Sequence, residues 1–130
     1  MNDDNNWLFR DCAHAVAATA KCRRSKVGAV IADRDNILLT GCNRILSDGP
    51  SCLDGGCPRG LADYDTVPAK TSTESGPGKC IAIHAEAAVI ASAAKLGIRL
   101  WDTTMYVTKE PCDTCARLIQ AAGIRNVVWP

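Results

Sequence analysis

Four residues in two short motifs carry the side chains that hydrolysis at a metal ion requires. His84, Cys112 and Cys115 offer one imidazole and two thiolates, which can bind one zinc ion and leave its fourth position to water. Glu86 follows the histidine by two residues, where its carboxylate can reach that water without binding the metal. Zinc lowers the pKa of bound water from about 16 to about 7. These residues therefore predict a catalytic zinc site in which Glu86 accepts and returns the water's proton.

Neither motif is specific when taken alone. A histidine followed at the second position by a glutamate is common and usually marks a capped helix. The run from Pro111 to Cys115 could also be a redox pair or half of a structural zinc site. Here both motifs occur in this order, and each opens a predicted helix, with a predicted strand between them. The combined pattern is the signature of zinc-dependent base deaminases.

The elements that hold these residues follow from the apolar pattern. An Ala-rich helix is expected over Ile81–Lys95, with Gly97 as its C-cap, and a second amphipathic helix over Cys112–Ala122. A strand over Thr103–Thr108 connects them. The first turns of two adjacent helices can converge, and Cys112 and Cys115 share one helix face because they are three residues apart. The helix dipole also favours thiolate over thiol at these N-termini.

The rest of the chain completes a mixed sheet covered by helices. A hairpin is expected around the turn at 33–36, because its Asp and Asn residues interrupt two apolar runs. The further elements are a helix over Trp7–Ala20, strands over Val27–Ala32 and Ile37–Gly41, and a last strand over Ile124–Trp129. The order α-β-β-α-β-α-β predicts an α/β fold.

Composition limits the class of protein. A chain of 130 residues suits one domain, and a net charge of +1 gives no sign of a polyanion partner. Aromatic residues make up 5% of the chain and form no basic stripe, which argues against a nucleic-acid partner. No apolar run approaches the ~20 residues needed to span a bilayer, so no membrane partner is expected. The polar N-terminus resembles no signal peptide, and eight cysteines without one are typical of metal ligands and buried thiols in the cytosol.

Residues 43–79 are expected to be irregular, because they hold most of the prolines and many glycines. Four cysteines lie in or beside this insertion: Cys22, Cys52, Cys57 and Cys80. Four thiolates would form a closed tetrahedral zinc site, which would tie the insertion to the helix that bears His84 and Glu86. The alternative is four separate buried thiols, although a Gly- and Pro-rich segment offers little core to bury them.

These motifs resemble the cytidine and deoxycytidylate deaminase superfamily over about residues 20–130. The deoxycytidylate branch is the nearest, because its bacterial and phage members carry cysteines in similar places and several bind a second, structural zinc there. The resemblance implies a cytidine-deaminase-like three-layer α/β/α fold with helices on both faces of the sheet. It also implies a homo-oligomer and a role in pyrimidine nucleotide metabolism.

The resemblance further implies two substrate contacts. The backbone N–H of Ala85 would contact the pyrimidine carbonyl, and Asn43 would contact the nucleotide sugar. A phosphate would need cations, and the candidates near the motif loops are Arg24, Lys26, Arg44 and Arg59. The sequence departs from the family at Gly41-Cys42-Asn43-Arg44, where G-Y-N-G is usual. The family often carries a base-stacking aromatic further along; Trp129 is a candidate for this role, and its alternative is edge-strand packing.

The sequence thus predicts a zinc-dependent deaminase of a cytosine nucleotide, converting deoxycytidylate (dCMP) to deoxyuridylate (dUMP) and ammonia. Two alternatives stay open. One is a deaminase of another cytosine compound, such as cytidylate (CMP), a nucleoside or a specialised metabolite. The other is a non-catalytic zinc-binding subunit with the same fold.

Overall fold

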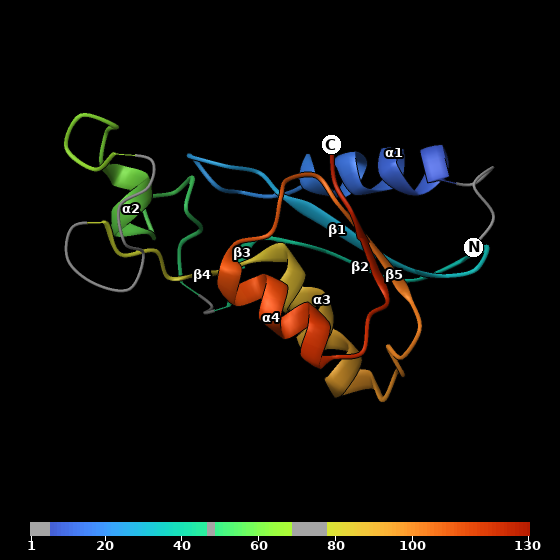
Figure 1. Cartoon of the computed structure of the whole chain (residues 1–130). Helices are drawn as coiled ribbons and strands as arrows, with labels where there is room; N and C mark the ends of the chain where they lie inside the picture. Colours follow the sequence, from blue (N-terminus) through green and yellow to red (C-terminus); the bar gives the residue numbers. More distant parts are fainter. Residues whose placement is uncertain (1–5, 47–48, 69–77) are drawn as a thin grey trace.

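The computed structural model describes residues 6–46, 49–68 and 78–130 (Figure 1). The helices are α1 (Asn6–Ala17), α2 (Pro58–Leu61), α3 (Ala85–Leu96) and α4 (Asp113–Ala121). The strands are β1 (Gly28–Asp33), β2 (Asn36–Cys42), β3 (Arg44–Ile45), β4 (Ala82–Ile83), β5 (Thr104–Val107) and β6 (Asn126–Val128).

The main sheet is mixed, as predicted. Its strand order is β2-β1-β5-β6. The neighbours of β1 both run antiparallel to it, with Val30 opposite Thr40 on β2 and opposite Tyr106 on β5. The last pair, β5 and β6, is parallel, and helix α4 makes the crossover between these two strands. This unit brings the N-terminus of α4 to the end of β5, next to the N-terminus of α3.

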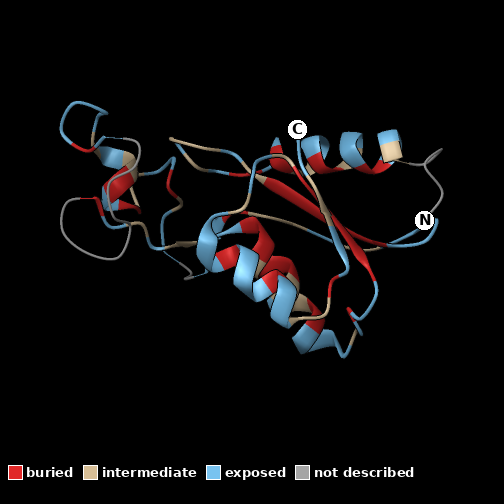
Figure 2. Ribbon diagram, in the orientation of Figure 1, coloured by how far each residue is buried: buried red, intermediate tan, exposed pale blue. Residues whose placement is uncertain are grey.

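Helices cover both faces of the sheet, which confirms the predicted three-layer arrangement. Figure 1 shows α1 on one side and α3 with α4 on the other. Strand β1 alternates accordingly: Ala29 and Ile31 pack with α3 and α4, whereas Val30 and Ala32 pack with α1. Figure 2 shows that the buried sides of α1 and α3 face the sheet. No helix within the described ranges is long and apolar enough to cross a membrane.

The α1 layer lies unusually close to the sheet. A Cβ added at Gly28 would lie 2.1 Å from the backbone oxygen of Ala13, so only glycine allows this contact. On the same face, the rings of Phe9 and Tyr106 are tilted at 51° with centroids 5.2 Å apart. The close packing fixes the start of β1, and therefore the segment before it that reaches the candidate site.

The predicted start of the third helix is wrong by four residues. Ile81–Ile83 do not belong to α3, because Ala82 and Ile83 pair with Ile45 and Arg44 in a two-stranded sheet. His84 keeps an extended backbone with ψ of 152° and forms the N-cap of α3. The predicted C-cap is confirmed: Gly97 adopts the left-handed conformation with φ of 71°.

The described residues of the insertion, 43–46, 49–68 and 78–79, contain more regular structure than its composition suggests. The insertion extends beyond one end of the main sheet and contains α2, and the pair β3–β4 closes its base (Figure 1). Cys52, Cys57 and Val67 are 4%, 1% and 1% exposed, so the expectation that this segment has little core is wrong. Arg59 also ties two distant parts of the insertion together, donating from Nη1 to the Gly78 carbonyl at 3.0 Å.

Candidate active site and metal centre

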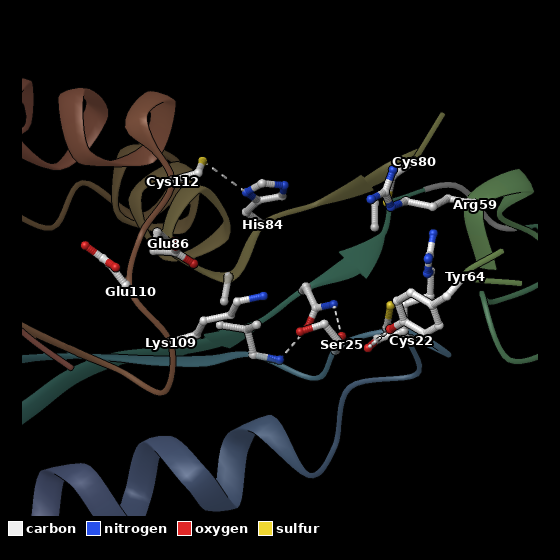
Figure 3. A pocket seen from close by; sticks show the side chains of 15 residues that line it. Cys22, Ser25, Arg59, Tyr64, Cys80, His84, Glu86, Lys109, Glu110 and Cys112 are labelled. Carbon is white, nitrogen blue, oxygen red and sulfur yellow. Dashed lines mark hydrogen bonds between the residues drawn. The ribbon is translucent and has the colours of Figure 1, made fainter. Parts of the chain in front are cut away.

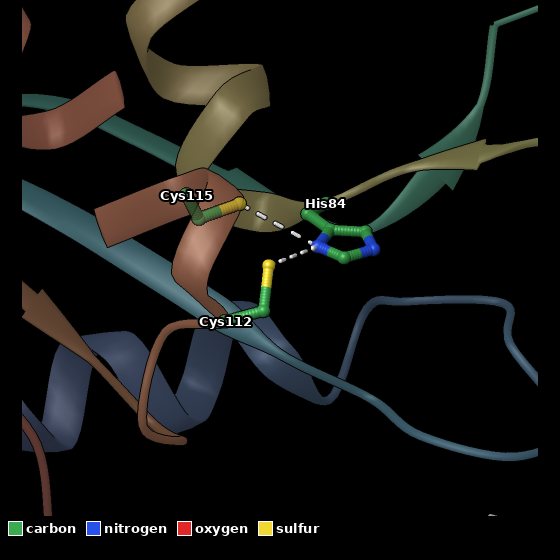
Figure 4. A group of neighbouring side chains, drawn as sticks. All are labelled: His84, Cys112 and Cys115. Carbon is green, nitrogen blue, oxygen red and sulfur yellow. Dashed lines mark hydrogen bonds between the residues drawn. The ribbon is translucent and has the colours of Figure 1, made fainter. Parts of the chain in front are cut away.

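The three predicted zinc ligands converge at the N-termini of two neighbouring helices (Figure 4). His84 is the N-cap of α3, Cys112 is the N-cap of α4, and Cys115 lies in the first turn of α4. Neither N-cap side chain caps its own helix, so the imidazole and the Cys112 thiol both remain available to a ligand. Cys112 Sγ and Cys115 Sγ lie 3.7 and 3.5 Å from His84 Nδ1. The prediction that these residues come together is therefore confirmed.

The spacing of these atoms fits zinc. All three ligand atoms lie within 4.8 Å of one another. Zinc–sulfur and zinc–nitrogen bonds of about 2.3 and 2.1 Å at tetrahedral angles put sulfur and nitrogen about 3.6 Å apart. The observed separations of 3.5 and 3.7 Å agree with that value. Three protein ligands also leave one position open, which distinguishes a catalytic site from a structural one.

The electrostatics of the cluster favour a cation. Burial, together with the nearby negative charge of Glu86 and the neighbouring Cys112, raises the pKa of the Cys115 thiol to about 12. Without a positive ion, the buried thiol therefore stays protonated at neutral pH. A metal ion reverses this preference because it binds thiolate, so two thiols gathered around one imidazole have the character of a metal site.

Glu86 and Ala85 occupy the first turn of α3 directly beyond His84. Glu86 is only 4% exposed and Ala85 is fully buried. Backbone N–H groups in a first helical turn have no partner within the helix, so the Ala85 N–H is free to donate to a ligand. Both residues line the same pocket as His84 and Cys112, which places a carboxylate and a hydrogen-bond donor beside the metal ligands.

This pocket has a volume of about 370 Å³, within the range of small-ligand sites. Figure 3 shows His84, Glu86 and Cys112 at one end, with Tyr64, Cys22, Arg59 and Cys80 across from them. The near end is built by α3 and α4 of the main fold. The far end includes Arg59 and Tyr64 from the insertion, so two parts of the chain form one cavity.

Comparison with known proteins identifies the fold family. The family described as the cytidine and deoxycytidylate deaminase zinc-binding region matches residues 2–130. The chain belongs to this deaminase family. The resemblance inferred from the two motifs is confirmed, and the His84–Cys112–Cys115 cluster is a group of side chains that could hold the metal of such a family.

The chain is similar to several proteins of this family and to a solved structure. A deoxycytidylate deaminase of Mycobacterium phage D29 is 38% identical over 98% of this chain and 94% of its own length. ComE operon protein 2 of Bacillus subtilis is 31% identical over 95% of this chain and 58% of its own length. Among solved structures, the dCMP deaminase of cyanophage S-TIM5 in complex with dCMP and dUMP has a TM-score of 0.73. It is 21% identical, over 99% of this chain and 82% of that one, and confirms the fold.

Asn43 lines the deaminase pocket, but its side chain already has partners. Its Oδ1 accepts from the Val27 N–H at 2.8 Å, and its Nδ2 donates to the Ser25 carbonyl at 2.8 Å. The side chain therefore fixes the segment before β1. One amide hydrogen remains for a ligand, so its predicted contact with the sugar stays a prediction.

The predicted cations divide into two groups. Arg24 and Arg59 line the pocket, whereas exposed Lys26 lies outside its lining and Arg44 borders a neighbouring cavity. The lining also includes Tyr64 and Lys109, which sequence reasoning missed. Lys109 could have been found because it lies three residues before Cys112. Tyr64 carried no such signal, because its loop reaches the site only through the fold.

Trp129 is 42% exposed and borders a separate cavity with α1 and β5, away from the pocket lining.

The four remaining predicted ligands form a looser group. Cys22 Sγ and Cys52 Sγ lie 4.0 Å apart, and Cys57 and Cys80 interact with each other. Within the described part of the chain, only the His84 cluster brings three ligand atoms within 4.8 Å of one another.

Backbone N–H groups surround the sulfurs of this second group. The Arg23 N–H donates to Cys52 Sγ at 3.4 Å. Burial opposes ionisation of Cys57, but N–H groups of Gly60, Ile81 and Arg59 lower its pKa below the usual value. Burial raises the pKa of Cys52 to about 11. Within the second group, the pKa of Cys57 is therefore lowered, whereas burial raises those of Cys52 and Cys80.

Proposed function

We infer that this protein is a zinc-dependent hydrolytic deaminase that converts dCMP to dUMP and ammonia. The observation that carries the proposal is the cluster of His84, Cys112 and Cys115 beside buried Glu86 at the end of one pocket. The 38% identical phage relative, named deoxycytidylate deaminase over nearly its whole length, supports the choice of substrate. So does the similarity in fold to a structure that holds dCMP and dUMP.

The protein's own residues perform positioning and proton transfer. When bound by His84, Cys112 and Cys115, zinc supplies a Lewis acid that makes water a nucleophile at neutral pH. The Glu86 carboxylate takes a proton from water and delivers it to ring nitrogen N3, then assists protonation of the departing amine. The Ala85 N–H donates to the pyrimidine carbonyl at C2 and orients the ring. Water adds at C4 and the C4–amine bond breaks, which leaves the uracil ring and ammonia.

The pocket supports a nucleotide rather than a polymer. Its far wall includes Arg24, Arg59 and Tyr64, so a base at the zinc end places its sugar and phosphate within a walled cavity. A single small cavity of about 370 Å³ suits a mononucleotide. A nucleoside substrate or a non-catalytic subunit would retain the cluster but give no role to the cationic wall, whereas CMP would use this wall as dCMP does.

The test is ammonia release from dCMP, run beside CMP, deoxycytidine, cytosine and single-stranded DNA. The expected result is turnover with the highest kcat/KM on dCMP. Turnover of another compound with silence on dCMP would overturn the proposed substrate while retaining the zinc mechanism. Zinc binding without turnover of any of these compounds would favour the non-catalytic alternative.

A second, structural zinc at Cys22, Cys52, Cys57 and Cys80 is part of the proposal. Tetrahedral zinc separates thiolate sulfurs by about 3.8 Å. The 4.0 Å between Cys22 and Cys52 is close to that distance, and the N–H groups directed at Cys52 and Cys57 suit thiolate ligands. Metal analysis of the purified protein is expected to give two zinc ions per chain, and one would reject the second site.

Three further features stay predictions. Residues 1–130 are expected to form one deaminase domain, in line with a family match over 2–130. A homo-oligomer would cover apolar side chains such as Leu96 and Trp101, which are 63% and 66% exposed. Size-exclusion chromatography with light scattering, which measures the mass of the assembly, tests for this homo-oligomer. All eight cysteines are free, which suits the cytosol.

A further inference from the structure

Among the residues that the structure describes, a guanidinium nitrogen in the pocket wall has no hydrogen-bond partner. Arg24 Nη1 is buried and makes no hydrogen bond among the described residues, whereas Nη2 of the same guanidinium donates to the Val67 carbonyl. Arg24 lines the pocket that holds the zinc cluster at its other end. A buried charged donor without an acceptor is unfavourable. The free nitrogen therefore points to an acceptor that a ligand in the pocket brings.

Tyr64 determines where this guanidinium lies. The Arg24 guanidinium carbon is 3.9 Å from the centroid of the Tyr64 ring, which is a cation–π contact. The Tyr64 hydroxyl also donates to the Arg24 carbonyl at 3.3 Å. Tyr64 thus contacts both the side chain and the backbone of Arg24, although the two residues lie in different parts of the sequence.

The turn that carries Tyr64 is itself fixed. The Thr66 N–H donates to Asp63 Oδ1 at 2.7 Å, and the Val67 N–H donates to the Asp63 carbonyl at 2.9 Å. These bonds fold residues 63–67 into a compact loop, with Val67 only 1% exposed. The loop therefore presents the ring of Tyr64 and the carbonyl of Val67 to Arg24 from one rigid frame.

The position suits a phosphate group. Figure 3 shows Tyr64 across the pocket from Cys112 and Glu86, so it lies far from the reacting carbon. A cytosine nucleotide with its ring at the zinc end extends its sugar and phosphate in this direction. Arginine binds phosphate better than lysine because its planar fork matches two oxygens.

We propose that Tyr64 is a positioning residue that holds Arg24 ready to bind the 5′-phosphate of the substrate. The insertion then sets the preference for nucleotide over nucleoside, although it supplies none of the catalytic zinc ligands. This inference rests on the proposed function, since it deepens the choice of a cytosine nucleotide.

The other two pocket cations are less suited to this role. Arg59 Nη1 already donates to the Gly78 carbonyl at 3.0 Å, which ties it to the insertion. Lys109 is exposed and enters from the loop before Cys112, on the catalytic side of the pocket (Figure 3). Its ammonium is a mobile point charge rather than a fixed fork. Lys109→Met therefore belongs in the test as the competing assignment.

The experiment compares dCMP with deoxycytidine in Arg24→Gln, Tyr64→Leu and Tyr64→Phe. Arg24→Gln is expected to lower kcat/KM for dCMP by about 10- to 100-fold, mainly through KM, because a charged hydrogen bond is lost. Tyr64→Leu removes the aromatic ring and is expected to lower kcat/KM for dCMP by about 3- to 30-fold. Tyr64→Phe keeps the ring and should change it less than about 3-fold. Deoxycytidine kinetics should remain unchanged in all three variants.

Two controls separate this role from a general effect on the fold. Leu61→Ala alters an exposed residue of the same insertion, and Lys95→Gln removes a positive charge from an exposed position on α3. Both should leave the ratio of dCMP to deoxycytidine activity unchanged. Binding of dUMP and deoxyuridine gives a readout that needs no turnover, and Arg24→Gln should weaken only dUMP.

The proposal would be overturned if Arg24→Gln and Tyr64→Leu lowered kcat/KM equally for dCMP and deoxycytidine. It would also be overturned if Lys109→Met lost the preference for dCMP while Tyr64→Leu kept it. Wild-type protein that binds dUMP no more tightly than deoxyuridine would overturn it too. Failure of the proposed function is recognised separately, because wild-type protein would then turn over a substrate other than dCMP. Turnover of dCMP with unaltered selectivity in the Arg24 and Tyr64 variants would reject this inference alone.

Discussion

The two groups of sulfur ligands in this chain are built on different kinds of support. His84, Cys112 and Cys115 lie at the N-termini of helices whose buried faces form the main core, through residues such as Val89 and Ile119. Cys52 and Cys57 lie in an insertion whose base is closed by the two-residue strands β3 and β4. The first group has three ligand atoms within 4.8 Å, whereas the second has a sulfur pair at 4.0 Å.

This difference shows where metal binding and folding are coupled. A long-range core positions His84, Cys112 and Cys115 before any metal binds, so a metal there would add chemistry to a site that already exists. The second group has less support, so a metal there would contribute to the folding of the insertion itself. Because the insertion carries Tyr64 and Arg59 into the pocket, its metal would affect substrate binding while the core ligands control catalysis.

The largest expected effect is loss of the catalytic ligand Cys115. Cys115→Ser should abolish zinc binding at the helix N-termini and lower kcat by about 10³-fold or more, because the metal supplies several kcal/mol of stabilisation. Zinc analysis should then find one ion instead of two, with the thermal melting temperature changed little. A variant that loses both ions would contradict the independence of the two groups.

Glu86→Gln separates catalysis from metal binding within the first group. The substitution keeps the size of the side chain and removes its ability to carry a proton. We expect kcat to fall by about 10²- to 10⁴-fold while two zinc ions remain bound. Asp113→Asn, an exposed acid in the first turn of α4, is the matched control and should retain activity. Full activity in Glu86→Gln would refute the proposed proton transfer.

The same contrast explains how far the sequence predicts the structure. The convergence of His84, Cys112 and Cys115 was predictable because both motifs are short, each opens a helix, and helix periodicity extends over many residues. The mixed sheet followed from strand patterns such as Thr103–Thr108, observed as Thr104–Val107. These features depend on local pattern, which a sequence displays directly.

The features that escaped prediction depend on contacts between distant segments. Helix α3 begins at Ala85 because Ala82 and Ile83 pair with a strand almost forty residues earlier, and no local signal opposes a helix there. Tyr64 reaches the pocket only because residues 63–67 fold against Arg24. Asn43 is likewise held by Ser25 and Val27, a role that its place after a strand does not reveal.

Cys57→Ser tests the second group directly. Cys57 is 1% exposed and interacts with Cys80 beside the pocket, so its loss should remove one zinc ion and loosen the insertion. We expect KM for dCMP to rise by about 3- to 10-fold, with kcat changed less than about 3-fold, since ground-state binding is weakened. Limited proteolysis should cleave the insertion faster than in wild type. Cys12→Ser on α1 is the control for loss of a thiol elsewhere. A fall in kcat comparable to that of Cys115→Ser would show that the insertion supports the chemistry itself.

The smallest effect is expected from Gly60→Ala, which leaves every ligand in place. A Cβ at Gly60 would lie 2.4 Å from Cys52 Sγ, so that sulfur must move away. Displacing one ligand of a tetrahedral site weakens zinc binding without removing a donor, and overpacking of this kind costs about 1–3 kcal/mol. A chelator should therefore remove the zinc ion of the second group at a lower concentration than in wild type. The deaminase activity after loss of this ion should equal that of wild type treated in the same way. Leu61→Ala, at the neighbouring exposed position, should behave as wild type. If Gly60→Ala titrates like wild type, Cys52 is not a zinc ligand, and its 4.0 Å approach to Cys22 is only the packing of two buried thiols.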